Sequence, residues 1–219
     1  MLLTNADLDH VLGLILLREG GRLEIRATTA VRESLEIGLN FHHVVGAFAE
    51  VSWIEPGAQF SPLLDGTEPT GLRYRSIALP GGPPRYLRQP SQFPDGHSIA
   101  YEIRDERTGG RLLVASDVAA TTPDLESAMD EADAILFDGT FWSPEELRAI
   151  QPGARSAAEM GHLPVSEGSL PLLRTRRAQR KIYVHINNTN PILHPDSSER
   201  AALDAAGVLV GSDGFSFEL

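Results

Sequence analysis

The sequence predicts a layered α/β domain in which short buried strands alternate with helices. One observation is the nearly continuous apolar run at residues 134–137, as expected for a strand covered on both faces. A second is the hairpin pattern of residues 98–103 and 111–115, which flank a glycine-containing turn. A third is the Ser-Pro-Glu-Glu sequence at 143–146, typical of a helix start. The length suits one domain with a sizeable core, and we expect residues 1–219 to form one.

The first part of the chain should contain two main helices and three strands. Asp7 or Asp9 can cap a helix that runs to about Glu19 and is closed by Gly20-Gly21. The other elements expected before residue 80 are a strand at 23–27, a helix from Thr28 or Thr29 to Leu39, a short helix at 41–48, a strand at 50–54, a loop at 56–71 and a strand at 72–79. The loop is expected because its segment holds three prolines and three glycines with little periodicity.

A long Gly/Pro-rich loop at residues 80–96 precedes the second part, and loops of that length are often functional. The hairpin turns through Thr108-Gly109-Gly110. The elements expected after it are a helix at 123–129, the strand at 134–137, a helix opened by 143–146, a helix following 159–163, a strand at 181–186, a helix at 197–206 and two short strands at 208–210 and 215–217.

The composition restricts partners and chemistry. The formal net charge of −11 argues against nucleic acid as a bulk electrostatic partner, because phosphate binding needs a basic surface. No apolar run reaches the roughly 18–20 residues that span a bilayer, so we expect no membrane partner and a cytoplasmic location. The chain has no cysteine, which excludes thiolate zinc sites and cysteine nucleophiles. A metal ion would have to be held by His, Asp, Glu or Asn.

Polar residues follow three of the expected strands. Asp117, Asp138 and His185 come at or just after strand ends, the edge where α/β sheets place their ligands. Any one of them alone is more often a turn residue. His185 could also be a hydrogen-bonded core histidine, but the Asn-rich run from Asn187 to Asn190 places further polar groups at the same position. Together these residues predict one site.

The N-terminal segment offers a second set of candidates. Asp7 and Asp9 lie at the start of an expected helix, where carboxylates are favourable as caps, and capping is the simpler interpretation of this motif taken alone. Asp9 and His10 are also a carboxylate and an imidazole that can converge on one metal ion.

The chain carries several dense motifs, namely Gly-Leu-x-x-Leu-Arg-Glu-Gly at 13–20, Asp-Gly-Thr-x-Trp at 138–142, Glu-Met-Gly-His-Leu at 159–163 and His-Ile-Asn-Asn-Thr-Asn-Pro-Ile-Leu at 185–193. Together they resemble the coenzyme PQQ synthesis protein B family, a branch of the metallo-β-lactamase fold. The fold carries a His-x-His-x-Asp-His loop. Aligned on Asp9 and His10, this chain has Asn5 and Asp7 in place of the two leading histidines, a substitution typical of this branch.

The resemblance implies a metallo-β-lactamase-like αββα sandwich. Family members carry a further N-terminal portion with the first strands of the sandwich and a Cys-x-Cys-x-x-Cys zinc site. This chain has neither, so we expect a partial domain that lacks the first N-terminal strands and has no cysteine zinc site.

The resemblance also implies Asp9, His10 and His185 as ligands of one divalent metal ion. Asp117 is a further candidate ligand, because it stands where the wider fold uses a metal-binding aspartate and where many relatives have glycine. Two histidines and one carboxylate suit non-haem Fe(II), which we favour over Zn(II). We assign catalytic roles to His162 and Asn187.

The function implied is a step in the biosynthesis of the cofactor pyrroloquinoline quinone (PQQ). We expect a metal-dependent hydroxylase that acts on the tyrosine of the PQQ precursor, a small or peptide-derived molecule. The alternatives are a carrier that moves PQQ or its precursor towards the periplasm, a metal-dependent hydrolase of the same superfamily, or an inactive fragment. Other PQQ biosynthesis proteins are candidate partners, and a homodimer is left open.

Overall fold

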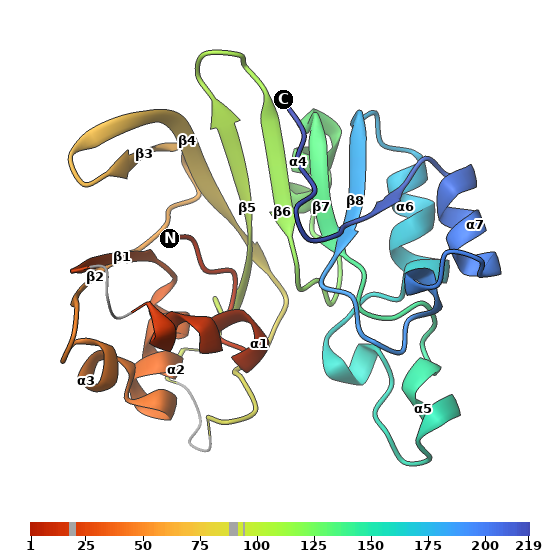
Figure 1. Cartoon of the computed structure of the whole chain (residues 1–219), viewed down its shortest axis with the longest axis horizontal. Helices are drawn as coiled ribbons and strands as arrows, with labels where there is room; N and C mark the ends of the chain where they lie inside the picture. Colours follow the sequence, from red (N-terminus) through yellow and green to blue (C-terminus); the bar gives the residue numbers. More distant parts are fainter. Residues whose placement is uncertain (18–20, 88–91, 94) are drawn as a thin grey trace.

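The computed structural model describes residues 1–17, 21–87, 92–93 and 95–219, and it divides into a small N-terminal lobe and a larger sheet covered by helices (Figure 1). Two parallel strands, β1 (Arg22–Arg26) and β2 (Glu50–Ile54), form the sheet of the lobe. Its helical elements are α1 (Leu8–Val11), the 3-10 turn η1 (Leu12–Leu16), α2 (Thr29–Leu39) and α3 (Phe41–Val45).

The lobe has its own apolar core, and local sequence signals set the ends of its main helix. Thr28 caps α2, because its hydroxyl accepts a hydrogen bond from the Val31 amide at 3.1 Å. The helix ends at Asn40, whose φ of 51° turns the chain into α3. The core unites residues of the helices and of β1, among them Val11, Ile25, Val31, Leu35 and Phe41.

The larger sheet has seven strands in the order β3-β4-β5-β6-β7-β8-β9. They are β3 (Ser61–Asp65), β4 (Glu68–Leu79), β5 (Ser98–Asp105), β6 (Arg111–Ala115), β7 (Ala134–Asp138), β8 (Arg180–Val184) and β9 (Leu209–Val210). Strands β3 to β6 pair antiparallel, and β6 to β9 pair parallel. The sheet is therefore mixed, with the parallel part at the C-terminal side.

Helices pack against the parallel part. They are α4 (Pro123–Glu131), the π-helical turn η3 (Val165–Ser169), α6 (Leu170–Arg174) and α7 (Ser198–Ala205) (Figure 1). Leu125, Leu173 and Leu203 from these helices are fully buried with Leu113 and Ile135 of the strands. The remaining short elements are α5 (Glu146–Ile150) and the 3-10 turns η2 (Ala158–Met160) and η4 (Pro191–Leu193).

The structure confirms the layered α/β arrangement and the hairpin, in which Tyr101 of β5 pairs with Val114 of β6. It corrects the loop predicted at 56–71. Pro62 and Pro69 lie in strands β3 and β4, which form a hairpin at the edge of the sheet, where a missing amide is tolerated.

Two other predictions needed correction. The first helix ends as α-helix at Val11 and continues only as the 3-10 turn η1, and the part predicted at 18–20 lies outside the described residues. The strand predicted at 215–217 does not form. The predicted loop at 80–96 holds no helix or strand in the part that the structure describes, and its residues 88–91 and 94 lie outside that part. None of the helices in the described ranges is both long and apolar enough to span a bilayer.

Candidate metal centre

The parallel register of the sheet brings the strand-end residues together. Ala115 of β6 pairs with Phe137 of β7, which in turn pairs with Tyr183 of β8. The residues that follow these positions, Asp117 and His185, therefore emerge at one edge of the sheet, beside Asp138 at the end of β7. The prediction from strand ends alone thus placed all three residues in the same neighbourhood.

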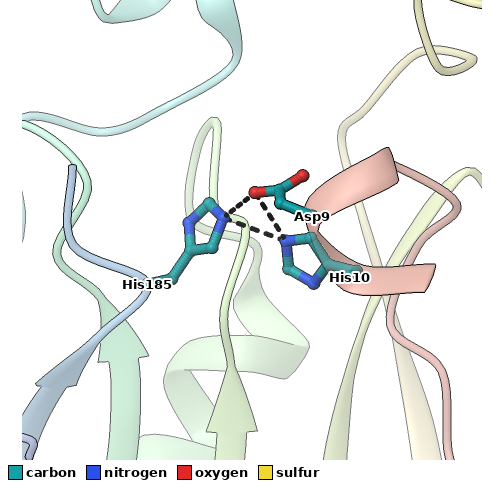
Figure 2. A group of neighbouring side chains, drawn as sticks. All are labelled: Asp9, His10 and His185. Carbon is teal, nitrogen blue, oxygen red and sulfur yellow. Dashed lines mark hydrogen bonds and ion pairs between the residues drawn. The ribbon is translucent and has the colours of Figure 1, made fainter. Parts of the chain in front are cut away.

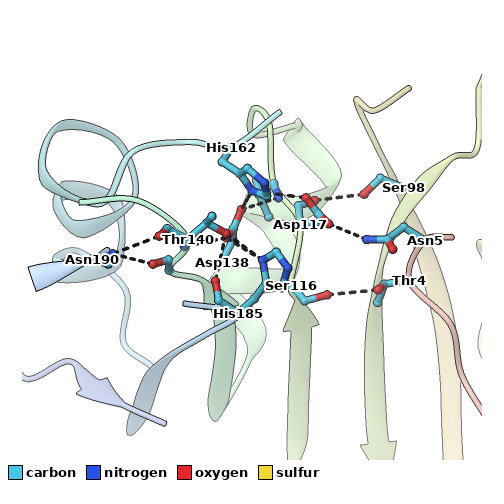
Figure 3. A network of polar contacts seen from close by, with 12 residues as sticks. Thr4, Asn5, Ser98, Ser116, Asp117, Asp138, Thr140, His162, His185 and Asn190 are labelled. Atoms are coloured by element: carbon cyan, nitrogen blue, oxygen red, sulfur yellow. Dashed lines mark hydrogen bonds and ion pairs between the residues drawn. The ribbon is translucent and has the colours of Figure 1, made fainter. Parts of the chain in front are cut away.

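The N-terminal loop is attached to this edge by polar contacts. The Thr4 hydroxyl lies 3.1 Å from the hydroxyl of Ser116, and the Asn5 amide donates to Asp117 Oδ2 at 2.6 Å (Figure 3). Helix α1 starts directly after this loop and carries Asp9 in its first turn. The loop thereby holds residues from the start of the chain against strand ends more than a hundred positions away.

Asp9, His10 and His185 converge on one point (Figure 2). His185 Nε2 lies 2.9 Å from His10 Nε2 and 3.0 Å from Asp9 Oδ2. His10 Nε2 and Asp9 Oδ2 are 3.8 Å apart. Asp9 is the exposed member, with 66% of its side chain accessible. Asp7 occupies the N-cap position but makes no side-chain cap, so the capping interpretation is wrong for Asp7, and Asp9 faces His185 instead.

The spacing and chemistry of these three groups fit a divalent metal ion. Two ligands held about 2.1 Å from one ion lie roughly 3.0–3.4 Å apart, close to the separations of His185 from its two neighbours. Imidazole nitrogen with carboxylate oxygen is a donor set that both iron and zinc accept. Two ring nitrogens that face each other at 2.9 Å share at most one proton between them, so a cation is the ligand that suits both lone pairs.

The second polar group is centred on the buried carboxylate of Asp138 (Figure 3). Its Oδ2 accepts the Val118 amide at 3.0 Å and lies 2.8 Å from His162 Nδ1. Its Oδ1 accepts the amide of Thr140 at 3.0 Å and the hydroxyl of Thr140 at 2.5 Å. All sides of this carboxylate are thus engaged by donors of the protein, which is the arrangement that a buried charge requires.

Thr140 connects this group to His185. Its hydroxyl proton goes to Asp138, so its oxygen is left to accept from His185 Nδ1 at 2.8 Å. His185 then carries its proton on Nδ1 and offers the lone pair of Nε2 to the cluster with Asp9 and His10. Such outer partners of a metal-binding histidine fix its tautomer and ring orientation. A φ of 53° at His185, rarely adopted outside glycine, turns the residue sharply at the end of β8.

Electrostatics follow from this geometry. Burial raises the pKa of Asp138, but hydrogen bonds from His162, His185 and Thr140 outweigh it and hold that pKa well below its ordinary range. Burial lowers the pKa of His162, and the carboxylates of Asp138 and Asp117 more than reverse this and raise it. Burial also lowers the pKa of His185, but the neighbouring carboxylates, Asp138 above all, outweigh burial and raise this pKa to about 9.

A cleft of about 630 Å³ lies over both groups. Asp9, Asp117, His162 and His185 line it, whereas Asn187 does not. The Asn187 amide donates to the Thr189 hydroxyl at 2.6 Å and stabilises the loop after β8. The structure therefore brings His162 to the cleft and leaves Asn187 outside it.

Asp117 lies between the two groups. Its Oδ2 is 3.4 Å from His10 Nε2, and its Oδ1 is 3.4 Å from His162 Nδ1. Asp7 also lines the cleft, and its pKa is raised by burial and by the carboxylates of Asp117 and Asp9. The cleft therefore concentrates negative charge around the imidazoles, which favours a bound cation.

Sequence reasoning missed two residues of the cleft. His97, directly before β5, is buried, and no hydrogen-bond partner for its Nδ1 occurs among the described residues. Tyr86 donates its hydroxyl to the Ala6 carbonyl at 2.7 Å and so supports the N-terminal loop. A histidine that opens a strand after a long loop is the signal that could have identified His97.

Comparison with known proteins agrees with this architecture. A family model described as a β-lactamase superfamily domain matches residues 1–186. The chain is 36% identical over its whole length to coenzyme PQQ synthesis protein B of Pseudomonas protegens, of which it covers 73%, and 36% identical to that of Rhizobium meliloti, of which it covers 71%.

Solved structures give the same result. The Zn²⁺-bound PqqB from Methylobacterium extorquens superimposes with a TM-score of 0.84 at 31% identity, over 100% of this chain and 72% of that one. A diphosphatase of the PhnP family aligns with a TM-score of 0.62 at 16% identity, over 98% of this chain and 68% of that one, and shows only that the fold is shared. The fold is thus the metallo-β-lactamase fold, and the chain belongs to the coenzyme PQQ synthesis protein B family.

Proposed function

We propose that this chain acts in PQQ biosynthesis as a metal-dependent hydroxylase of the tyrosine in the PQQ precursor. The observation that carries the proposal is the convergence of Asp9, His10 and His185 on one point beside an open cleft. Two histidines and one carboxylate with free positions are typical of oxygen-activating non-haem iron sites. The names of the relatives support the PQQ part of the proposal.

Each residue has a role in this proposal. Asp9, His10 and His185 would hold the ion, and bound Fe(II) would supply the activation of O₂. Thr140 keeps the proton of His185 on Nδ1. His162 Nδ1 donates to Asp138, so its other nitrogen can take the phenolic proton of a tyrosine in the cleft.

The choice of Fe(II) over Zn(II) rests on the reaction. One oxygen atom of O₂ enters an aromatic C–H bond, and the other leaves as water with two electrons and two protons from an external reductant. Zinc has no redox chemistry and cannot serve this step. Zinc in a relative is consistent with the same donors, because imidazole and carboxylate bind both metals.

Oxygen uptake tests the proposal. Protein reconstituted with Fe(II) and ascorbate should consume O₂ and add one oxygen atom to a glutamyl-tyrosine peptide. His185→Ala should abolish the reaction, and His162→Ala should slow it roughly 10²-fold or more. Arg177→Gln, on an exposed side chain that does not line the cleft, is the matched control and should keep full activity. Product formation without oxygen would contradict the hydroxylase.

A hydrolase is the second candidate, and Asp117 is the residue that favours it. This carboxylate lies between His10 and His162 and adds a possible fourth ligand to Asp9, His10 and His185. Hydrolases of this chemistry generally use two metal ions. Zinc-loaded protein that binds two equivalents and turns over anaerobically would favour the hydrolase.

A further inference from the structure

Two arginines line the cleft that holds the candidate metal centre. Arg85 belongs to the segment between β4 and β5, and Arg155 to the segment between α5 and η2. Both side chains are exposed, and both reach a cleft that also contains His162 and His185.

Neither guanidinium has a hydrogen-bond or ion-pair partner within the described part of the chain. Ten other arginines in the described ranges pair with carboxylates, namely Arg22, Arg26, Arg73, Arg75, Arg104, Arg107, Arg111, Arg148, Arg176 and Arg200. The arginines of those ranges that have no carboxylate partner and lie outside the cleft are Arg32, Arg174, Arg177 and Arg180. With a net charge of −11 the chain has a surplus of carboxylates, so the two unpaired arginines in its cleft call for an explanation.

The local structure keeps Arg155 unpaired. The nearest acidic residue in sequence, Glu159, already accepts from Arg148 at 2.6 Å and from the Ser156 amide at 2.7 Å. Arg148 also donates to the Ala154 carbonyl at 2.9 Å. The backbone on both sides of Arg155 is thus held, while its own side chain is left available.

Arg85 is held in a similar way. The Leu87 amide donates to the Pro84 carbonyl at 3.0 Å and closes a turn that contains Arg85. Next to it, Tyr86 donates to Ala6 and packs its ring against Gly38, where a Cβ atom would lie only 2.4 Å from the ring. The turn is therefore fixed to the N-terminal lobe, and it places Arg85 in the lining of the cleft.

We propose that Arg85 and Arg155 bind carboxylates of the substrate, and that the cleft selects a small molecule with at least two carboxylates. A guanidinium presents two parallel N–H donors that match a carboxylate, and such charge-assisted pairs are stronger than neutral hydrogen bonds. Two of them on separate segments would fix the orientation of the substrate against the metal centre. The proposal rests on the proposed function, since it names the substrate class of the same cleft.

Binding of PQQ tests this inference. PQQ carries three carboxylates, and its trimethyl ester presents the same ring system without their charges. Calorimetry would compare wild type with Arg85→Gln, Arg155→Gln, the double variant and the control Arg177→Gln, which removes an exposed arginine outside the cleft. Each single variant should bind PQQ about tenfold more weakly and the double variant about a hundredfold, with the control unchanged.

The trimethyl ester should bind wild type and all variants equally. Equal PQQ affinity in wild type and the double variant would overturn the proposal. The proposal would also be wrong if wild type showed no saturable binding of PQQ. It would be wrong as well if pyrophosphate displaced PQQ from wild type at a lower concentration than citrate does. The assay needs no turnover. Failure of the hydroxylase reaction with these affinity differences intact would therefore contradict the proposed function and leave the carboxylate site standing.

Discussion

The two polar groups at the edge of the sheet differ in how their donors are satisfied. Asp138 is fully buried and accepts from two backbone amides, from Thr140 and from His162. Asp9 and His10 make few bonds to the protein, and their ligand atoms face His185. A group whose bonds are complete supports its neighbours, whereas one whose lone pairs face each other is prepared for a ligand. We infer that the group around Asp138 positions His185, and that Asp9, His10 and His185 bind the metal ion.

The largest expected difference between the two groups is in the loss of folding stability when a carboxylate of each is replaced. Asp138→Asn replaces one carboxylate oxygen by an amide donor that faces N–H groups, and should cost about 3–5 kcal/mol of unfolding free energy. Asp9→Asn changes an exposed group and should stay within about 0.5 kcal/mol in chelator-treated protein. Urea unfolding measures both. Equal losses would mean that the two groups do not differ in this way.

The second effect is on the pH dependence of metal binding. In metal-free protein, burial lowers the pKa of His185, but neighbouring carboxylates raise it to about 9, above its ordinary value of 6.5. The protonated ring therefore stabilises the fold fully below pH 6.5, and this contribution is lost as the pH rises through about 9.

A metal ion must displace that proton. Its affinity should consequently rise about tenfold per pH unit within this window and level off above it. Competition with a chelator dye between pH 6 and 10 measures the slope. A flat profile would show that His185 is not a ligand.

A smaller effect is expected at the connection between the groups. Thr140→Val removes the hydroxyl that fixes the tautomer of His185 and should weaken metal binding roughly 10–100-fold. Thr140→Ser keeps the hydroxyl and should bind metal nearly as well as wild type. If valine and serine gave the same affinity, the buried group would not position His185.

The smallest effect is expected at the support of the N-terminal loop. Tyr86→Phe removes one hydrogen bond to the Ala6 carbonyl and should cost about 1 kcal/mol of stability. Metal stoichiometry should not change, because Asn5 still attaches the loop to Asp117. Urea unfolding measures the stability of this variant, and elemental analysis measures its metal content. Loss of the metal would show that the hydrogen bond from Tyr86 is needed to hold the N-terminal loop at the metal site.

Much of the fold could be predicted because its signals are local. The apolar strand at β7 and the threonine cap of α2 each follow from a few neighbouring residues. Strand β3 and the first residues of β4, at 68–71, were missed because their prolines and glycine are tolerated only at a sheet edge, and a sequence does not state which strand lies at the edge. The rest of β4 agrees with the strand predicted at 72–79.

The site was predictable in part for the same reason. Strand ends indicated Asp117, Asp138 and His185, since parallel strands deliver their C-terminal residues to one edge. The bond between Thr140 and His185, which follows a different strand, depends on the register of the sheet and is not encoded in sequence spacing. Asn187 was favoured by its place in an Asn-rich motif, but its amide is used within the loop.

Metal content of two variants tests the central claim most directly, because His10 belongs only to the group with Asp9 and His185, and His162 only to the group around Asp138. Protein reconstituted with Fe(II) or Zn(II) and freed of excess metal would be measured by elemental analysis. We predict about one equivalent in wild type and in His162→Ala, and loss of the metal in His10→Ala. Retention of metal by His10→Ala together with its loss from His162→Ala would contradict the account.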